Sequence, residues 1–178
     1  ALFVSVASMA QTWSLDKAHS NVGFTVTHMM LSEVDGNFKG YDAKLTSAKA
    51  DFSDAQFEFT APISGISTGM EMRDGHLQGE GWFNAAKFAN LTFKSTSVKK
   101  VKGNVYKIAG NLTMHGVTKP VVLNATLRGP IVDERSKKQK MGITATGTVN
   151  RVAFGVGTAG GGVSDDVVIK VAGEFSKD

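Results

Sequence analysis

The four histidines are the side chains in this sequence best suited to metal or acid–base chemistry, and their positions argue against a shared site. His19 and His28 are nine residues apart, and this odd separation places them on opposite faces of an extended strand. His76 falls in a stretch with helical spacing, and His115 falls in an expected turn. No pair has the i, i+2 spacing of a strand site or the i, i+4 spacing of a helical site. The sequence therefore predicts no metal site and no metal cofactor.

Asp16, His19 and Ser20 are the residue types of a nucleophilic triad. A triad requires side chains that converge in space, whereas neighbours on an extended strand diverge. The chain also has no cysteine and no Gly-x-Ser-x-Gly elbow. We therefore predict no catalytic residue and no enzyme activity. We expect His19 and Ser20 to hydrogen-bond to neighbouring backbone or to each other.

Two other features match functional motifs only in part. The glycines at 155, 157 and 160 have Gly-x-Gly-x-x-Gly spacing, but a strand-like segment follows them instead of the helix that a phosphate site needs, so a flexible loop is expected. The net charge of +4 is concentrated at residues 99–102 and 135–140. Neither cluster is interleaved with aromatic residues, as nucleic-acid surfaces are, so we expect solvated hairpin tips and no nucleic-acid partner.

The elements that must position these residues are mostly strands, because apolar and polar residues alternate along the chain. In the first strand Val22, Phe24, Val26 and His28 share one face, and small or polar residues share the other. One strand is expected over residues 32–45, and further strands over 55–63, 91–95, 105–114, 121–127, 141–149 and 167–175. The alternation breaks at residues 67–81, where the spacing predicts a short helix with Thr68 as its cap, and residues 84–88 suggest another helical turn.

Eight or nine strands with one polar face each predict an all-β fold, and the length of 178 residues suits a single domain. The residues alone leave open a sandwich or a closed barrel. They also leave open whether the inward residues fill a plain core or line a ligand cavity.

Residues 1–10 have the pattern of a signal-peptide remnant. An apolar run is followed by Ser8, Met9 and Ala10, which puts small residues at the −3 and −1 positions of a cleavage site. We expect cleavage there and a mature domain over residues 11–178; the alternative is an N-terminal apolar strand. No later apolar run approaches the roughly 20 residues of a membrane-spanning helix.

Motifs spread over most of residues 11–178 resemble the YceI-like family of periplasmic proteins. They are Trp13, Asp16, His19, Ser20, Phe24 and His28 followed by Gly36 and Phe38; Met72-Arg73-Asp74 with His76-Leu77; Phe93-Lys94-Ser95; Gly110-Asn111-Leu112-Thr113 with Gly116-Val117-Thr118; and Arg151 with Phe154-Gly155. Two local patterns differ. Trp82-Phe83-Asn84 replaces two Phe and an Asp, and Phe88-Ala89 replaces a Tyr-Pro pair.

This resemblance implies a lipocalin-like antiparallel eight-stranded barrel with a short helix. It also implies export to the periplasm and binding of a polyisoprenoid lipid, such as an isoprenoid quinone or its precursor, which the protein carries or sequesters. No cofactor is implied besides that lipid. A transient membrane-surface contact and a homodimer stay open. So do two other functions, an enzyme or redox-stress protein acting on an isoprenoid quinone, and a packed β-domain for protein contacts.

The ligand-binding residues expected on this basis are an apolar lining and a polar mouth. They are Phe24, Val26, His28, Met30, Phe57, Phe59, Met70, Met72, Arg73, Asp74, His76, Phe93, Met114 and Met141. The polar mouth would comprise His28, Arg73, Asp74 and His76. For Arg73 and Asp74 the alternative is a structural cap and ion-pair cluster.

Overall fold

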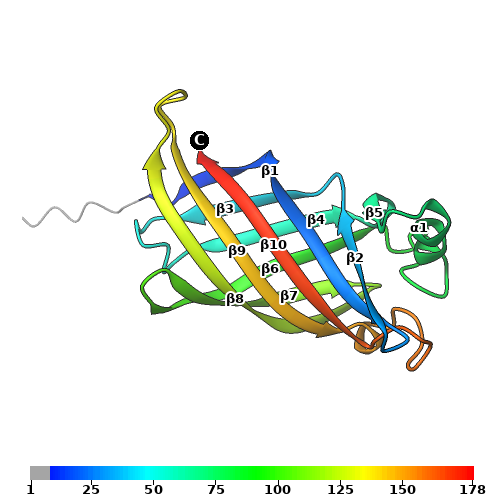
Figure 1. Ribbon diagram of the computed structural model, residues 1–178. Helices are drawn as coiled ribbons and strands as arrows, with labels where there is room; N and C mark the ends of the chain where they lie inside the picture. The colour runs from blue at the N-terminus through cyan, green and yellow to red at the C-terminus, as the bar shows by residue number, and fades with distance from the viewer. Residues whose placement is uncertain (1–8) are drawn as a thin grey trace, which may run out of the picture.

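The computed structural model describes residues 9–178, which form ten strands and one α-helix (Figure 1). The strands are β1 (Gln11–His28), β2 (Ser32–Phe38), β3 (Asp42–Ser47), β4 (Gln56–Pro62), β5 (Ile66–Ser67), β6 (Asn90–Lys102), β7 (Val105–Met114), β8 (Val117–Val132), β9 (Gln139–Asn150) and β10 (Asp166–Lys177). The helix is α1 (Glu71–Gln78), and short 3₁₀ turns span Ile63–Gly65 and Val152–Phe154. The expected signal-peptide remnant lies mostly outside the described residues, because only Met9 and Ala10 of its ten residues are described.

The strands close into an antiparallel barrel, so the barrel is correct and the sandwich is not. Neighbouring strands pair in the order β3, β4, β6, β7, β8, β9 and β10, and β10 then pairs with β1, which also pairs with β3. Trp13 faces Lys177 and Phe24 faces Ile169 across the closing seam. The eight strands of this ring leave β2 and β5 as an added pair on the side of β1. Closure removes free strand edges from the ring.

The single strand predicted over residues 32–45 is wrong, because the structure has two strands there. The C-terminal half of β1 pairs with β2, with Phe24 opposite Gly36. The N-terminal half of β1 pairs with β3, with Trp13 opposite Leu45. Between the two strands the chain bends at Gly40, whose φ is +70°. A left-handed residue of this kind interrupts regular pairing, and glycine adopts it without strain.

The helix is confirmed at residues 71–78, within the predicted stretch, but the cap is not Thr68. The N-cap position is Met70. Thr68 lies before it, where its backbone N–H and its hydroxyl donate to Oδ1 of Asp74 at 2.8 and 2.6 Å. The turn expected at residues 84–88 is present, since the N–H of Phe88 donates to the carbonyl of Asn84 at 2.8 Å. Among residues 9–178 the helices are too short or too polar to cross a bilayer.

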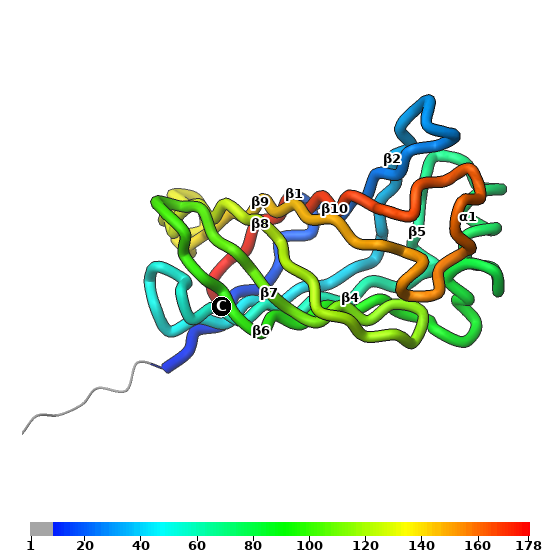
Figure 2. Tube along the Cα trace, turned by 90° about the horizontal axis from the view of Figure 1, so that it is seen from below, coloured from blue at the N-terminus to red at the C-terminus, as the bar shows by residue number. Residues whose placement is uncertain are grey.

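One end of the barrel is plugged by the connection between β3 and β4. Phe52 enters this end and packs edge-on against Trp13, with ring centroids 5.4 Å apart and both side chains 3% exposed. The hydroxyl of Tyr106 donates to the carbonyl of Asp51 at 2.6 Å. The opposite end carries α1, the β1–β2 turn and the loop after Arg151, as Figures 1 and 2 show. We call the Phe52 end the closed end and the α1 end the mouth.

Candidate functional site

An elongated apolar cavity of about 420 Å³ lies inside the barrel. β1 contributes its predicted inward face, Val22, Phe24, Val26 and His28, to the wall. Across the seam the lining from β10 is mainly Val167, Ile169, Val171, Gly173 and Phe175, together with Ala172. The period of two in each strand explains this lining, because every second side chain of a closed barrel points inward.

The inward side chains differ in exposure along the barrel, and this shows that the interior is hollow. At the closed end Trp13, Leu45 and Phe52 are buried, as in an ordinary core. Toward the mouth Phe24, Phe59 and Phe93 also point inward, yet they stay only half-buried. Close-packed interiors leave few voids larger than a water molecule. Side chains that face inward and remain accessible therefore border an unfilled space.

Two phenylalanine rings occupy the space that a side chain on a glycine of the wall would need. A Cβ added to Gly36 would come within 2.3 Å of Cζ of Phe24. A Cβ added to Gly110 would come within 2.4 Å of Cζ of Phe93. Without a side chain on either glycine, each ring settles against the wall. The glycines thus set the width of the cavity.

Arg73 and Asp74 lie at the mouth, where they are held in a local structural cluster around Thr68. The Nε of Arg73 donates to the hydroxyl of Thr68 at 2.7 Å, and its Nη2 donates to the Thr68 carbonyl at 2.8 Å. Asp74 accepts from Thr68 as described above. Arg73 and Thr68 line the cavity, whereas Asp74 lies behind them. This geometry favours the structural alternative for the Arg73–Asp74 pair.

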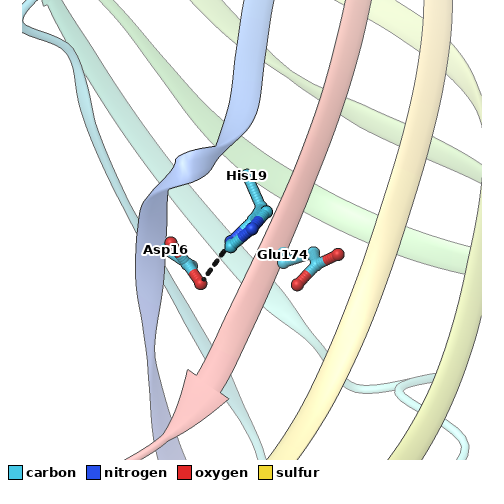
Figure 3. A group of neighbouring side chains, drawn as sticks. All are labelled: Asp16, His19 and Glu174. Carbon is cyan, nitrogen blue, oxygen red and sulfur yellow. Dashed lines mark hydrogen bonds and ion pairs between the residues drawn. The ribbon is translucent and has the colours of Figure 1, made fainter.

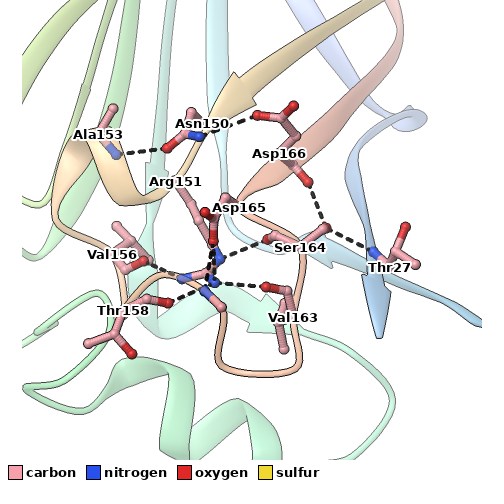
Figure 4. A network of polar contacts seen from close by, with 11 residues as sticks. Thr27, Asn150, Arg151, Ala153, Val156, Thr158, Val163, Ser164, Asp165 and Asp166 are labelled. Carbon is pink, nitrogen blue, oxygen red and sulfur yellow. Dashed lines mark hydrogen bonds and ion pairs between the residues drawn. The ribbon is translucent and has the colours of Figure 1, made fainter. Parts of the chain in front are cut away.

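Arg151 is the buried cation of the mouth, with only 4% of its surface exposed. Figure 4 shows its guanidinium at the centre of the loop that follows it. It donates to the carbonyls of Ser164, Val156, Thr158 and Val163 at 2.8–3.0 Å and to Oδ1 of Asp165 at 3.3 Å. The guanidinium also lies over the ring of Trp82, with Cζ of Arg151 5.2 Å from the ring centroid. Arg151 therefore shapes one side of the mouth from within.

His28 and His76 complete the polar lining at the mouth. His28 ends β1 and forms a backbone bridge with Val163. His76 lies on α1, with its ring 6.1 Å from that of Trp82. Tyr41 also lines the cavity, and burial raises the pKa of its hydroxyl. The site thus offers hydrogen-bonding groups near its opening and apolar walls below.

Nine of the fourteen predicted ligand-binding residues line the cavity. They are Phe24, Val26, His28, Phe57, Phe59, Arg73, His76, Phe93 and Met114. The other five lie outside it. Met30, Met70 and Met72 are exposed at 93%, 54% and 85%, because the first is in the β1–β2 turn and the others flank or begin α1. Asp74 is behind Thr68, and Met141 is packed in the core of the closed end.

Several lining residues were not anticipated from the sequence, chiefly Tyr41, Trp82, Phe83 and Arg151. Tyr41 follows the bend at Gly40. The bend shifts the alternation of inward and outward side chains by one residue, so the pattern of the preceding strand does not identify Tyr41 as inward. Trp82 and Phe83 lie in an irregular segment after α1, where periodicity gives no direction. Arg151 carried a signal in the sequence, as part of the quoted family motifs, but its type suggests an exposed residue.

A bulge in β1 brings Asp16 and His19 together, so the expected divergence of these side chains is wrong. Regular pairing with β10 is interrupted between Asp16 and Asn21. Nδ1 of His19 lies 3.0 Å from Oδ2 of Asp16, and this hydrogen bond raises the pKa of His19 and lowers the pKa of Asp16. The hydroxyl of Ser20 donates to the Asp16 carbonyl at 2.7 Å, a backbone contact of the expected kind. Ser20 and His19 thus bind different parts of Asp16.

Comparison with known proteins identifies close sequence relatives and the same fold. The family model described as the YceI-like domain matches residues 13–175. Protein YceI of Salmonella newport is 36% identical over 99% of this chain and 93% of that protein. The crystal structure of the Campylobacter jejuni YceI protein superposes with a TM-score of 0.77 at 32% identity, covering 92% of this chain and 96% of the other.

A more distant structural neighbour shares the fold alone. It is a polyisoprenoid binding domain from Saccharophagus degradans implicated in plant cell wall breakdown, with a TM-score of 0.67 at 13% identity. The alignment covers 94% of this chain and 99% of that domain.

Proposed function

Because the chain belongs to the YceI-like family, we propose that it binds a polyisoprenoid lipid in the lumen of its barrel and carries or sequesters that lipid away from water. The observation that carries the proposal is the hollow apolar lumen, plugged at the closed end and open at the mouth. The binding described for the Saccharophagus degradans domain of the same fold supports it. Burial of one isoprene unit contributes up to about 4 kcal/mol at roughly 0.8 kcal/mol per carbon.

The dimensions of the lumen suit a chain of several isoprene units. From Val167 to Phe175 the lining of β10 spans eight residue steps. At about 3.3 Å per residue and a strand tilt of about 40°, that is roughly 20 Å along the barrel axis. One isoprene unit adds four carbon–carbon bonds of about 1.5 Å, which lengthen an extended lipid chain by roughly 5 Å. The lumen therefore holds about four units, with the head group at the mouth.

The head group that fits this mouth is uncharged, as in an isoprenoid quinone or its phenolic precursor. Arg73 and Arg151 are the permanent cations among the described residues of the lining, and both are committed to the protein's own carbonyls. A buried phosphate needs cationic partners, and taking either arginine would leave carbonyls unsatisfied. His28 and His76 can instead hydrogen-bond to a neutral oxygen. The polar mouth that we propose is this histidine pair.

A binding role is favoured over catalysis by the chemistry of the lumen. The lining is predominantly apolar, and the pair Asp16–His19 lies on the outer wall, away from any ligand in the lumen. The enzyme or redox-stress alternative would require reacting groups beside the head of the lipid. We propose periplasmic residence, with residues 1–10 removed on export. Intact mass of the exported precursor checks this, since retention of residues 1–10 would contradict it.

The exposed apolar turn between β1 and β2 suits a transient contact with a membrane surface. Met29, Met30 and Leu31 are 60%, 93% and 85% exposed, and the N–H of Met29 donates to the carbonyl of Gly162 at 2.6 Å, which ties this turn to the loop of the mouth. A water-insoluble ligand must enter through this opening. If the apolar turn beside the opening inserts into the bilayer surface, the lipid can pass between the acyl region of the membrane and the lumen without crossing water.

Vesicle co-sedimentation tests this contact. We expect Met30→Ser with Leu31→Ser to reduce association with phosphatidylethanolamine–phosphatidylglycerol vesicles. The matched control, Val122→Ser at a 54% exposed position on the wall of β8, should not. Equal behaviour of both variants would contradict a membrane contact. A concentration-dependent dimer that the double variant abolishes would assign the same turn to a homodimer instead.

The central experiment is native mass spectrometry of the protein purified from a bacterial host, followed by organic extraction. We expect one prenyl lipid per chain. A protein that stays empty when offered prenyl lipids would overturn the proposal, and turnover of an added quinone would establish the enzyme alternative.

A polyprenol should then displace bound lipid at least about tenfold better than the polyprenyl phosphate of equal length. Preference for the phosphate would overturn the neutral head group and leave the lumen binding intact.

A further inference from the structure

On the outer wall of the barrel, we propose that Asp16, His19 and Glu174 form a binding site for a divalent transition-metal ion of the zinc class. One ligand atom from each side chain lies within 4.8 Å of the other two. Figure 3 shows Asp16 and His19 facing each other at the seam where β1 meets β10, with Glu174 beside them on β10. One imidazole nitrogen and two carboxylates form a ligand set that zinc accepts.

The fold places two of these ligands by register and the third by the bulge. Asp16 and Glu174 are direct partners across the antiparallel seam. Their neighbours Leu15 and Phe175 line the lumen, so alternation turns both carboxylates to the outside. In a regular strand His19 would point to the opposite face from Asp16. The residues inserted before Asn21 return it to the carboxylates.

Ser20 holds the bulge in this shape from both strands. Its hydroxyl donates to the carbonyl of Asp16 at 2.7 Å and accepts from the backbone N–H of Glu174 at 3.2 Å. One side chain therefore connects the backbone of two of the three ligands. The ligand atoms are partly preorganised before any ion arrives, which lowers the cost of assembling the site.

The distances require only a small adjustment for an ion. Zinc bonds of about 2.0–2.2 Å in a tetrahedron place ligand atoms roughly 3.3–3.6 Å apart. Nδ1 of His19 is already 3.0 Å from Oδ2 of Asp16, and the three ligand atoms all lie within 4.8 Å of one another. The ion would replace the proton shared by His19 and Asp16. A fourth position faces solvent, because the His19 side chain is 65% exposed.

Lys140 gives the site a built-in competitor. Its ammonium is 3.9 Å from Oδ2 of Asp16, and its side chain is 27% exposed on β9. A divalent ion must displace this single charge or share the carboxylate with it. The sign of the effect is therefore fixed: removal of the Lys140 charge should tighten metal binding, because like charges repel. A loss of packing would have the opposite effect or none.

An ion here would join β1 to β10 at the point where their regular pairing is interrupted. A ligand that binds only the folded chain raises its stability. The site is independent of the lumen, since its ligands point outward while their neighbours face the cavity. Lipid content and metal content should therefore vary separately.

Calorimetric titration of tag-free, EDTA-treated protein with ZnCl2 tests the proposal. We expect one site per chain, and at least about a 10- to 100-fold weaker affinity in His19→Gln and in Glu174→Gln, as for loss of groups that support a bound metal. Lys140→Met should bind several-fold more tightly. His115→Gln and Glu58→Gln, which remove a histidine and a carboxylate elsewhere, should bind as the parent does.

Three outcomes would overturn the site: no zinc binding by the parent, an equal loss in the two control variants, or weaker binding by Lys140→Met. Circular dichroism and lipid content of each variant separate these outcomes from misfolding. Glu174→Gln preserves shape and serves if His19→Gln folds poorly. Zinc binding with an empty lumen would support this site while contradicting the lipid proposal, so the two proposals can fail separately.

Discussion

At the scale of single residues, charged side chains at the ends of the barrel form hydrogen bonds with the backbone. Arg151 is the strongest case, because its guanidinium satisfies four carbonyls of a loop that has little regular structure. An arginine presents five donors in a fixed planar fork, whereas a lysine presents three on one atom. The loop at the mouth is therefore held by the shape of this side chain as well as by its charge.

Arg151→Lys should consequently destabilise the protein by about 2–4 kcal/mol, since it leaves buried carbonyls unpaired. Urea denaturation measures the loss. Limited proteolysis should show faster cleavage within residues 155–165 than in the parent. Arg128→Lys is the control, because Arg128 is exposed and, among residues 9–178, its guanidinium donates only to Thr144, at 3.3 Å. An equally small effect of both variants would contradict the structural role of Arg151.

Asp54 fixes the connection that plugs the closed end. Its carboxylate accepts from the hydroxyl of Ser47 at 2.6 Å and from the N–H groups of Ala48 and Lys49 at 2.9 and 3.1 Å. Burial alone raises the pKa of Asp54, but these hydrogen bonds outweigh it, and the net pKa is lowered. A carboxyl group whose pKa is lowered in the folded state stabilises the fold at pH values above its ordinary, unfolded pKa. This stabilisation is lost as the pH falls through the folded pKa.

Asp54→Asn should therefore lower stability at pH 7 by about 1 kcal/mol, or roughly 2–4 °C in Tm for a chain of this size. The difference from the parent should persist down to about pH 4 and shrink below it, because protonated Asp54 then resembles asparagine. Thermal melts across this range measure it. Asp42→Asn is the control, since the exposed Asp42 carboxylate pairs with Lys17 and accepts one backbone hydrogen bond, from the N–H of Ala43. A difference that stays constant to pH 2 would contradict the mechanism.

At the scale of elements, a glycine on one strand and a phenylalanine on its neighbour determine the width of the lumen. The three atoms nearest to a Cβ at Gly36 all belong to the Phe24 ring, at 2.3–2.8 Å. A Cβ at Gly110 meets the Phe93 ring and also the backbone carbonyl of Lys94, at 2.4–2.6 Å. The first clash is relieved if Phe24 rotates into the empty lumen. The second includes rigid backbone and cannot be relieved in that way.

Gly36→Ala should therefore keep stability within about 1 kcal/mol of the parent but weaken lipid binding, because the displaced Phe24 ring occupies the lumen. Gly110→Ala should cost about 1–3 kcal/mol, as overpacking does. Chemical denaturation of lipid-free protein and titration with a fluorescent polyprenol separate the two effects. Unchanged lipid affinity in a folded Gly36→Ala protein would show that Phe24 does not narrow the tunnel.

The elements also show what the sequence could and could not predict. Local alternation predicted the inward face of β1 correctly, from Val22 to His28, because parity needs only neighbouring residues. The bend at Gly40 and the bulge before Asn21 changed parity without a local signal, and these two irregularities hid Tyr41 and the Asp16–His19 pair. Met70 and Met72 had suitable chemistry for a lumen, but their exposure depends on how α1 is placed over the mouth.

At the scale of the whole molecule, the closed end and the lumen differ in how tightly their side chains are packed. The closed end is packed as a core around Trp13, Phe52 and Tyr106. The lumen lacks such packing, so the protein should gain stability when lipid fills it. Substitution of the same residue type at the two ends therefore gives a direct comparison.

Phe24→Ala and Phe52→Ala are that comparison. Phe52 is 3% exposed and outside the cavity, and its loss should cost roughly 3–5 kcal/mol whether or not lipid is bound. Phe24 borders the lumen and contacts Phe38, with ring centroids 5.8 Å apart, so part of its remaining surface is free for lipid. A ligand that binds only the folded state adds RT ln(1 + [L]/Kd) to stability, and this increment falls as Kd rises.

Delipidation should then lower the Tm of the parent. Lipid added back should restore as much stability to Phe52→Ala as to the parent, and less to Phe24→Ala. Thermal melts of matched lipid-free and lipid-loaded samples measure these increments, provided that all three proteins give the same β-type circular dichroism. Equal restoration in all three would exclude Phe24 from the binding surface. An increment of zero in all three would mean that lipid does not occupy the lumen, since even a narrowed tunnel that still bound its ligand would raise the Tm.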